Sequence, residues 1–299
     1  MEETSLLSTV PAKHKPASSI HFLVRLLWVR EFALILMIVF IGLALHLLTG
    51  HFLTTPNLNA IALGFATSAI IVLGMTAALV SGGFDLSVGS VFAVGGVTVA
   101  VALRAKLPIP IAILYGLGIG LLAGLVNGLL ITKVRINPFI TTLGMLGIAR
   151  GASLAITVGT PIGIHAEDFL VYGQGKFLEI PNLILIALFV ILIGNILMRR
   201  SVAFRQIYYI GGNEEAARLS GINADQVKTG FYVLAGTLAA LAGVLLVSRF
   251  TVADPGTGNG EKLRIIAACI IGGCSLSRGK EPLLAVYLAS SSLDLLITA

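Results

Sequence analysis

The charged side chains that interrupt the apolar stretches are the residues of this chain that could do chemistry. Asp85 lies between two apolar runs, and Arg150 lies inside a third. An ionisable group within a bilayer is costly, so it usually marks a functional site or a paired contact. Ser87 and glycines beside Asp85 indicate a turn, and we expect the Asp85 carboxylate to cap the helix that follows. Contact with a substrate and contact with another loop are the alternatives. Arg150 requires a carboxylate, a carbonyl or water as its partner.

The spacing of reactive residue types is unlike that of the common enzyme classes. The sequence has no His-Glu-x-x-His, no Gly-x-Ser-x-Gly, no phosphate-binding Gly-x-x-x-x-Gly-Lys-Ser/Thr, and no cluster of Asp, His or Cys within its apolar runs. Cys269 and Cys274 have no His or further Cys nearby to complete a metal site, so we interpret both as small packing residues. We expect no catalytic residue, no metal and no cofactor.

The composition predicts an integral membrane protein. The 299 residues are 57% hydrophobic and only 11% charged, whereas a soluble domain carries roughly 25% charged residues. The net charge of +6 comes from basic residues in short clusters between apolar runs, which is typical of membrane proteins and argues against nucleic acid as a partner.

Apolar runs long enough to approach a bilayer crossing recur along the chain. They predict an all-α, polytopic transmembrane helical bundle with about eight or nine spans, some of them broken or re-entrant. The domain organisation that we expect is a cytoplasmic N-terminal tail (1–30) followed by one membrane domain (31–299). The candidate spans are 32–49, 58–80, 88–103, 109–132, 138–158, 181–198, 229–248, 263–276 and 283–297.

The basic residues also predict the orientation, because Lys and Arg accumulate in cytoplasmic loops. With the N-terminus in the cytoplasm, thirteen of the twenty Lys and Arg residues fall on the cytoplasmic side and six on the other. Loops 133–137, 199–228 and 277–282 then lie inside, and the acidic loop 159–180 lies outside.

The sequence predicts a short helix within loop 199–228. Asn213 is placed to cap it, Glu214 and Glu215 would lie at its positive end, and Gly221 would end it. The apolar face would come from Ala216, Ala217 and Leu219. Such an amphipathic helix between two spans is a natural docking surface for a soluble partner.

A second start signal precedes the run at 138–158. Asn137 before Pro138 predicts a capped helix start. Thr141 and Thr142 follow in its first turns, where their hydroxyl side chains would allow close helix packing or, as the less favoured alternative, line a polar path.

Three segments resemble the ribose-type sugar permeases of bacterial ABC importers. They are SGGFDLSVGS at 81–90, INPFITTLGML at 136–146 and GGNEEAARLSGI at 211–222. The order and spacing of the segments also fit that family, from about residue 30 to about residue 276.

The resemblance implies a permease that transfers a monosaccharide, with no reaction performed by this chain. A second permease subunit, identical or related, would complete the pore in the bacterial inner membrane. A separate ABC ATPase subunit would supply the energy, and an extracytoplasmic sugar-binding protein would deliver the substrate. The resemblance implies a coupling role toward the ATPase for Gly211, Gly212, Asn213, Glu214, Glu215, Ala216, Ala217, Arg218 and Gly221. It makes Gly82, Gly83, Asp85, Ser87, Asn137, Pro138, Thr141 and Thr142 candidates for a signature loop or the pore.

Two further expectations complete the sequence-based picture. Family members usually continue from IIGGCSL with a Gly-rich stretch, whereas SRGKEPLLAVYLASSSLDLLITA follows here, so we expect an atypical or truncated segment after about 276. The competing function is an ion-coupled secondary transporter or a channel for a small polar solute, for which only Asp85 and Arg150 are coupling candidates.

Overall fold

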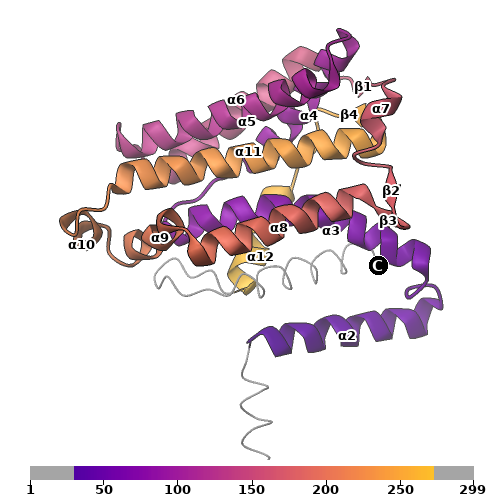
Figure 1. Ribbon diagram of the computed structural model, residues 1–299, viewed down its shortest axis with the longest axis horizontal. Coiled ribbons are helices and arrows are strands. Elements are labelled where there is room, and N and C mark those ends of the chain that lie inside the picture. Colours follow the sequence, from indigo (N-terminus) through magenta and orange to yellow (C-terminus); the bar gives the residue numbers. More distant parts are fainter. Residues whose placement is uncertain (1–29, 273–299) are drawn as a thin grey trace, which may run out of the picture.

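The computed structural model describes residues 30–272, which form a bundle of long helices (Figure 1). The N-terminal tail at 1–29, Cys274, loop 277–282 and the expected span 283–297 lie outside the described residues. The helices are α2 (Arg30–Thr49), α3 (Thr55–Val80), α4 (Val88–Arg104), α5 (Ile109–Thr132), α6 (Pro138–Thr157), α7 (Glu167–Leu170), α8 (Asn182–Arg200), α9 (Val202–Gly212), α10 (Glu214–Leu219), α11 (Ala224–Phe250) and α12 (Glu261–Gly272).

Helix α11 is the centre of the bundle. Its most extensive contacts are with α5, followed by α4 and α3. Figure 1 shows α5 and α6 on one side of α11, and α3 and α8 on the other. Helix α2 lies apart from these layers, and its apolar side chains such as Phe40 (71% exposed) and Leu48 (83% exposed) face outward. An apolar surface of this kind is expected where a helix meets lipid.

Small residues bring α5 and α11 into backbone contact. A Cβ atom on Gly120 or Gly124 would overlap the backbone of α11 at Gly236 or Tyr232. Without a hydrophobic driving force between helices in lipid, such close approach is the main source of packing energy. The glycines at 116, 120, 124 and 128 therefore serve helix packing, as their spacing in the sequence indicates.

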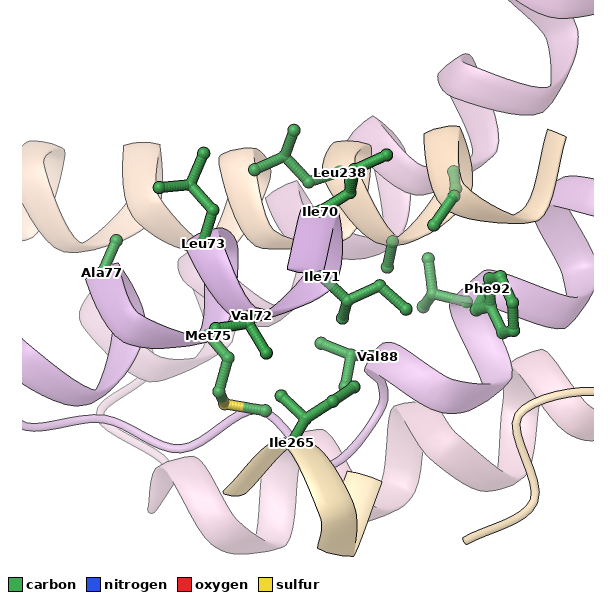
Figure 2. Packing of buried hydrophobic residues seen from close by; sticks show 14 of the residues in the cluster. Ile70, Ile71, Val72, Leu73, Met75, Ala77, Val88, Phe92, Leu238 and Ile265 are labelled. Carbon is green, nitrogen blue, oxygen red and sulfur yellow. The ribbon is translucent and has the colours of Figure 1, made fainter. Parts of the chain in front are cut away.

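The main apolar core extends through most of the bundle, and Figure 2 shows the part of it where α3, α4 and α12 meet. Ile71 and Met75 from α3 pack there with Val88 at the start of α4 and Ile265 of α12. Each of these four side chains is at most 1% exposed. Helix α12 is thereby fixed against the middle of α3.

Helix α4 is short, and a loop from the far end of α11 reaches its first turn. A Cβ on Gly89 would lie 2.6 Å from the carbonyl oxygen of Gly258, and Gly258 has a left-handed φ of +76°. The 251–260 loop thus returns from the end of α11 into the bundle before α12 begins. Two residues of this loop, Ala253 and Pro255, are buried, whereas Asn259 and Gly260 are exposed.

The expected helical fold is confirmed, while the number of spans is not settled. Five of the described helices (α3, α5, α6, α8 and α11) are long and apolar enough to cross a membrane, and the apolar parts of α2 and α4 are shorter. Part of the expected span 263–276 corresponds to α12. Helix α11 begins before the apolar run at 229–248, because its first turn is amphipathic and capped by Asn223.

The loop expected to be extracellular contains local structure that hydrophobicity does not predict. Two pairs of short antiparallel strands occur in the described part of the chain: β1 (Ile162–Gly163) with β4 (Val252–Ala253), and β2 (Lys176–Phe177) with β3 (Ile180–Pro181). The first pair joins the 159–180 loop to the segment that follows α11. The two ends of the bundle are named below by their contents: the α10 end, and the strand end that carries β1 to β4.

Candidate functional site

The three sequence motifs converge near the α10 end of the bundle. The 81–90 segment begins where α3 ends, the 136–146 segment begins shortly after α5 ends, and the 211–222 segment spans the end of α9 and all of α10. Lys133, just past α5, forms an ion pair of 3.5 Å with Asp225 at the start of α11. Segments that are far apart in the sequence are therefore connected here.

Helix α10 is defined by its caps, as the sequence predicts. The Asn213 side chain accepts a hydrogen bond from the backbone N–H of Ala216 at 3.0 Å. Gly221, two residues past the last turn, has a φ of +84°, which glycine adopts at no steric cost. The backbone N–H of Asn213 also donates to the Tyr209 carbonyl at 3.0 Å, so α9 leads directly into α10. Helix α9 itself was not predicted.

A network of charges fixes α10 to α11. Glu214 accepts hydrogen bonds from Arg218, at 2.9 Å, and from Lys228. Arg218 in turn pairs with Asp225. Burial raises the pKa of Glu214, but the hydrogen bonds and charges of Lys228 and Arg218 outweigh this effect and hold the pKa below its ordinary value. The carboxylate is therefore ionised under physiological conditions, and the helix is tied to the bundle by several charged contacts.

The outer face of α10 carries the residues that remain free to meet another molecule. Glu215 and Ala216 are exposed, and Leu219 is 86% exposed. Glu215 forms no ion pair with any residue between 30 and 272. A groove of about 490 Å³ runs beside this face and is lined by Tyr208, Tyr209, Gly212, Asn213, Ala216, Ala217, Ser220 and Ile222.

Ala217 has a different position from its neighbour. Its side chain is 4% exposed and packs with Ile210 and Ala224 in a small apolar cluster. The two alanines that the sequence suggested as one contact surface thus differ in exposure, although both line the groove beside α10. Ala216 faces outward, while Ala217 seats the helix on the bundle.

Gly211 brings the α9–α10 segment into contact with the start of the 81–90 segment. A Cβ on Gly211 would overlap the carbonyl oxygen of Val80, the last residue of α3. Gly212 has open space around its Cβ position. Only the first glycine of this pair is therefore required for packing, and it places α9 directly against the turn that leads to Asp85.

Gly82 and Gly83, in the turn between α3 and Asp85, are required for different reasons. Gly82 has a φ of +81° and open space, so its backbone conformation requires glycine. Gly83 has no room for a side chain, because a Cβ would overlap the hydroxyl of Tyr232. That hydroxyl donates to the Phe84 carbonyl at 3.3 Å, which fixes the turn against α11.

Asp85 belongs to a buried polar cluster. Its side chain is 1% exposed in the described structure, and it accepts hydrogen bonds from the backbone N–H of Ser87 at 2.8 Å and from the Ser87 hydroxyl at 2.5 Å. Asn127 of α5 donates to the same hydroxyl at 3.1 Å. The helix-cap prediction for Asp85 needs correction, because α4 begins at Val88 and the carboxylate bonds the residue before it.

Asn127 and Tyr232 are the residues that the sequence analysis missed. Asn127 is the single amide side chain in the apolar run 109–132, and that isolation was the available signal. Tyr232 carried no comparable signal, because a tyrosine in an apolar helix is unremarkable without its neighbours.

The Asn137 segment forms a helix start, and its threonines are buried. The Asn137 side chain accepts from the N–H of Phe139 at 2.8 Å. Thr142 is fully buried and donates to the Pro138 carbonyl at 2.8 Å, and Thr141 is 7% exposed. Both threonines lie inside the bundle, where α6 packs chiefly against α4.

Arg150 finds the carbonyl partner that its position in an apolar helix requires. Its guanidinium donates to the Pro255 carbonyl in the 251–260 loop, and the Asp254 carboxylate is close enough to interact with its charge. Arg150 therefore ties α6 to the loop that reaches α4.

Comparison with known proteins places these features in a family. The sequence model described as "Branched-chain amino acid transport system / permease component" matches residues 57–292. The L-arabinose transport system permease protein of Escherichia coli (strain K12) is 35% identical over 249 residues, which cover 83% of this chain and 76% of that protein. The ribose import permease protein of Bacillus subtilis (strain 168) is 39% identical over 238 residues, 78% of this chain and 73% of that protein. The ribose import permease protein of Escherichia coli (strain K12) is 37% identical over 237 residues, 78% and 74% of the two chains. No solved structure matches this chain.

Proposed function

This chain belongs to the family of transport-system permease components, and from that premise we propose that it is the membrane subunit of an ATP-driven importer for a monosaccharide. The family is one of transport permeases and not of enzymes. The helices long and apolar enough to cross a membrane agree with a multi-pass protein of the bacterial inner membrane. We propose further that the N-terminus and the α10 end face the cytoplasm.

The proposed substrate is a ribose-like or related small sugar or polyol. The similar proteins are named for L-arabinose and for ribose. A soluble binding protein would select the sugar and deliver it to the opposite, extracytoplasmic end.

The proposed energy source is a separate ATPase subunit that seats against α10. The observation that supports this best is that α10 has an exposed face and is also attached to the bundle. Ala216 and Leu219 are exposed, while Glu214 pairs with Arg218 and with Lys228 of α11. A partner that pushes on α10 would move α11 with it. Glu215, which forms no ion pair between residues 30 and 272, is suited to a basic residue on that partner.

The experiment is a pull-down of a soluble ABC-type ATPase by the detergent-purified permease. Ala216→Arg and Glu215→Lys are compared with wild type, and Arg200→Gln is the control, because Arg200 is exposed at the same end but lies in α8. We expect binding to be lost in the two α10 variants and retained in the control. Equal binding by all four proteins would place the ATPase elsewhere.

A transport assay separates the proposed function from an ion-coupled one. Uptake of labelled ribose or arabinose is measured in bacteria that lack their own pentose permeases and express this chain with its partner subunits. We expect uptake that disappears when the ATPase is inactivated. Uptake that survives this change but collapses when the proton and sodium gradients are dissipated would instead identify a secondary transporter.

A further inference from the structure

A pocket with mixed apolar and polar lining lies at the strand end of the bundle, away from the proposed ATPase contact at α10. It has a volume of about 430 Å³, which is within the roughly 300–1,000 Å³ typical of small-molecule sites. The wall is formed by the outer half of α3, the last turn of α11, the end of the 251–260 loop and the first turn of α12. Its polar and aromatic lining comprises Thr67, Ser68, Phe92, Arg249, Phe250, Thr257, Glu261 and Arg264.

Two side chains in this pocket have hydrogen-bonding capacity that the described residues do not use. One carboxylate oxygen of Glu261 accepts from Arg264 at 3.0 Å, while the other, Oε2, is buried with no hydrogen-bond partner between residues 30 and 272. The guanidinium of Arg249 lies 4.7 Å from the centre of the Phe250 ring and forms no ion pair within the same range. A buried carboxylate oxygen without a donor is costly, so a ligand that donates to it gains binding energy.

The chemistry of this lining fits a monosaccharide. A sugar has hydroxyl groups that donate and accept hydrogen bonds, and it has apolar C–H faces. The free oxygen of Glu261 accepts from a hydroxyl, the Arg249 guanidinium donates to one, and the rings of Phe92 and Phe250 offer apolar surfaces. An amino acid is less suited, because the charge that would attract its ammonium group is already neutralised by Arg264.

We propose that this pocket is a sugar-binding subsite of the permease, with Arg249 and Glu261 as its hydrogen-bonding pair. This inference rests on the proposed function and adds the place where the sugar is held. The subsite opens at the end of the bundle opposite α10. A sugar released from a binding protein would therefore meet it before it reached the buried cluster around Asp85.

The test uses cysteine protection in membranes that contain the complete importer. Thr257→Cys is introduced into a chain whose two native cysteines are replaced by alanine, and a membrane-impermeant maleimide is the probe. We expect D-ribose or L-arabinose to slow the labelling, by about tenfold at a concentration ten times the dissociation constant. L-leucine at the same concentration should have no effect.

Variants then identify the residues responsible. Arg249→Ala and Glu261→Gln should each raise the sugar concentration for half-maximal protection, and the KM of uptake, roughly tenfold. Arg249→Lys keeps the charge without the planar fork and should have a smaller effect, which guards against a folding defect in Arg249→Ala. Arg104→Ala is the matched control, because Arg104 is exposed at the strand end but lies outside this pocket.

The outcomes separate this inference from the proposed function. If cells import the sugar but neither pentose slows labelling at Thr257→Cys, the subsite is wrong and the importer remains. If L-leucine protects and the pentoses do not, the sugar assignment of the pocket is overturned. Absence of pentose uptake in cells with active partner subunits would count against the proposed function itself.

Discussion

At the scale of single residues, Gly211 and Gly212 are adjacent but differ in what surrounds them. We expect Gly211→Ala to lower the stability by about 1–3 kcal/mol, because the new methyl group would overlap the Val80 carbonyl and force α9 away from α3. Gly212→Ala, with open space, is the control and should be nearly neutral. The midpoint of thermal unfolding, followed by size-exclusion chromatography in detergent, measures both. Similar midpoints for the two variants would show that α9 does not pack as described.

The buried cluster around Asp85 allows a prediction that separates structure from substrate contact. Asp85→Ala leaves the N–H and hydroxyl of Ser87 without their acceptor, at a cost of about 1–3 kcal/mol for each buried group left unsatisfied. Asp85→Asn keeps one acceptor oxygen and should lose less. Asn127→Leu removes only one donor to Ser87 and should also lose less than Asp85→Ala.

Thermal stability and sugar uptake are measured together on these variants. We expect the two to fall in parallel, because the cluster holds the start of α4 and is buried from solvent. An Asp85→Asn protein that is as stable as wild type but transports no sugar would instead place Asp85 in contact with the substrate.

At the scale of elements, α10 is held by charge, and its attachment should depend on pH. The pKa of Glu214 is held below its ordinary value of 4.5, so the stabilisation is fully present above pH 4.5 and is lost as the pH falls through the lowered pKa. We expect hydrogen-exchange protection of residues 214–219, corrected for the intrinsic rate, to be constant near neutrality and to fall as the pH drops through the lowered pKa of Glu214.

Glu214→Gln is the matched variant for this experiment. It should reduce protection of α10 at neutral pH and make the further loss in acid smaller, because the Asp225 carboxylate, which pairs with Arg218, then remains as the titrating group of the network. Glu215→Gln is the control, since Glu215 has no ion pair in the described structure and should leave both properties unchanged. A loss of protection in acid as large in Glu214→Gln as in the wild type would contradict the assignment to this carboxylate.

The 251–260 loop is held in part by a side chain of α6. Arg150→Met removes the hydrogen bond to the Pro255 carbonyl and the interaction with Asp254. We expect faster maleimide labelling at Thr257→Cys in this variant, because the loop is released from α6. Ser153→Ala on the same helix is the control and should label at the wild-type rate, as Ser153 bonds only within α6. An unchanged rate in Arg150→Met would show that other contacts suffice to hold the loop.

Local features of these elements could be read from the sequence, and long-range pairings could not. The apolar runs predicted α3, α5, α6 and α8 closely, because lipid requires long uninterrupted apolar helices. Asn213, Asn137 and Gly221 were recognised because a cap acts within a few residues. The pairing of Gly89 with Gly258, of Asn127 with Ser87 and of Arg150 with Pro255 joins residues far apart in the chain. Periodicity and spacing carry no information about such pairs.

At the scale of the whole molecule, α11 connects the two candidate sites. At 27 residues it is about 40 Å long, with the charge network at one end and Arg249 at the other. Its backbone contact with α5 at Gly120 and Gly124 leaves little room for bending between these ends. A displacement of α10 by a partner would therefore reach the pocket at Arg249 through the movement of one rigid helix.

This connection predicts that nucleotide bound by the ATPase changes the pocket at the opposite end. We expect a non-hydrolysable ATP analogue to change the labelling rate of Thr257→Cys roughly fivefold or more in the assembled importer, which is typical of coupled sites.

In Lys228→Met the bond from α11 to Glu214 is lost. The nucleotide effect should then shrink, even though the exposed face of α10 is intact and the ATPase still binds. Lys133→Met is the comparison, because its longer and more exposed pair with Asp225 contributes less. If the nucleotide effect is undiminished in Lys228→Met, the movement reaches the pocket by another route, of which the contact between Gly211 and the end of α3 is the first to test.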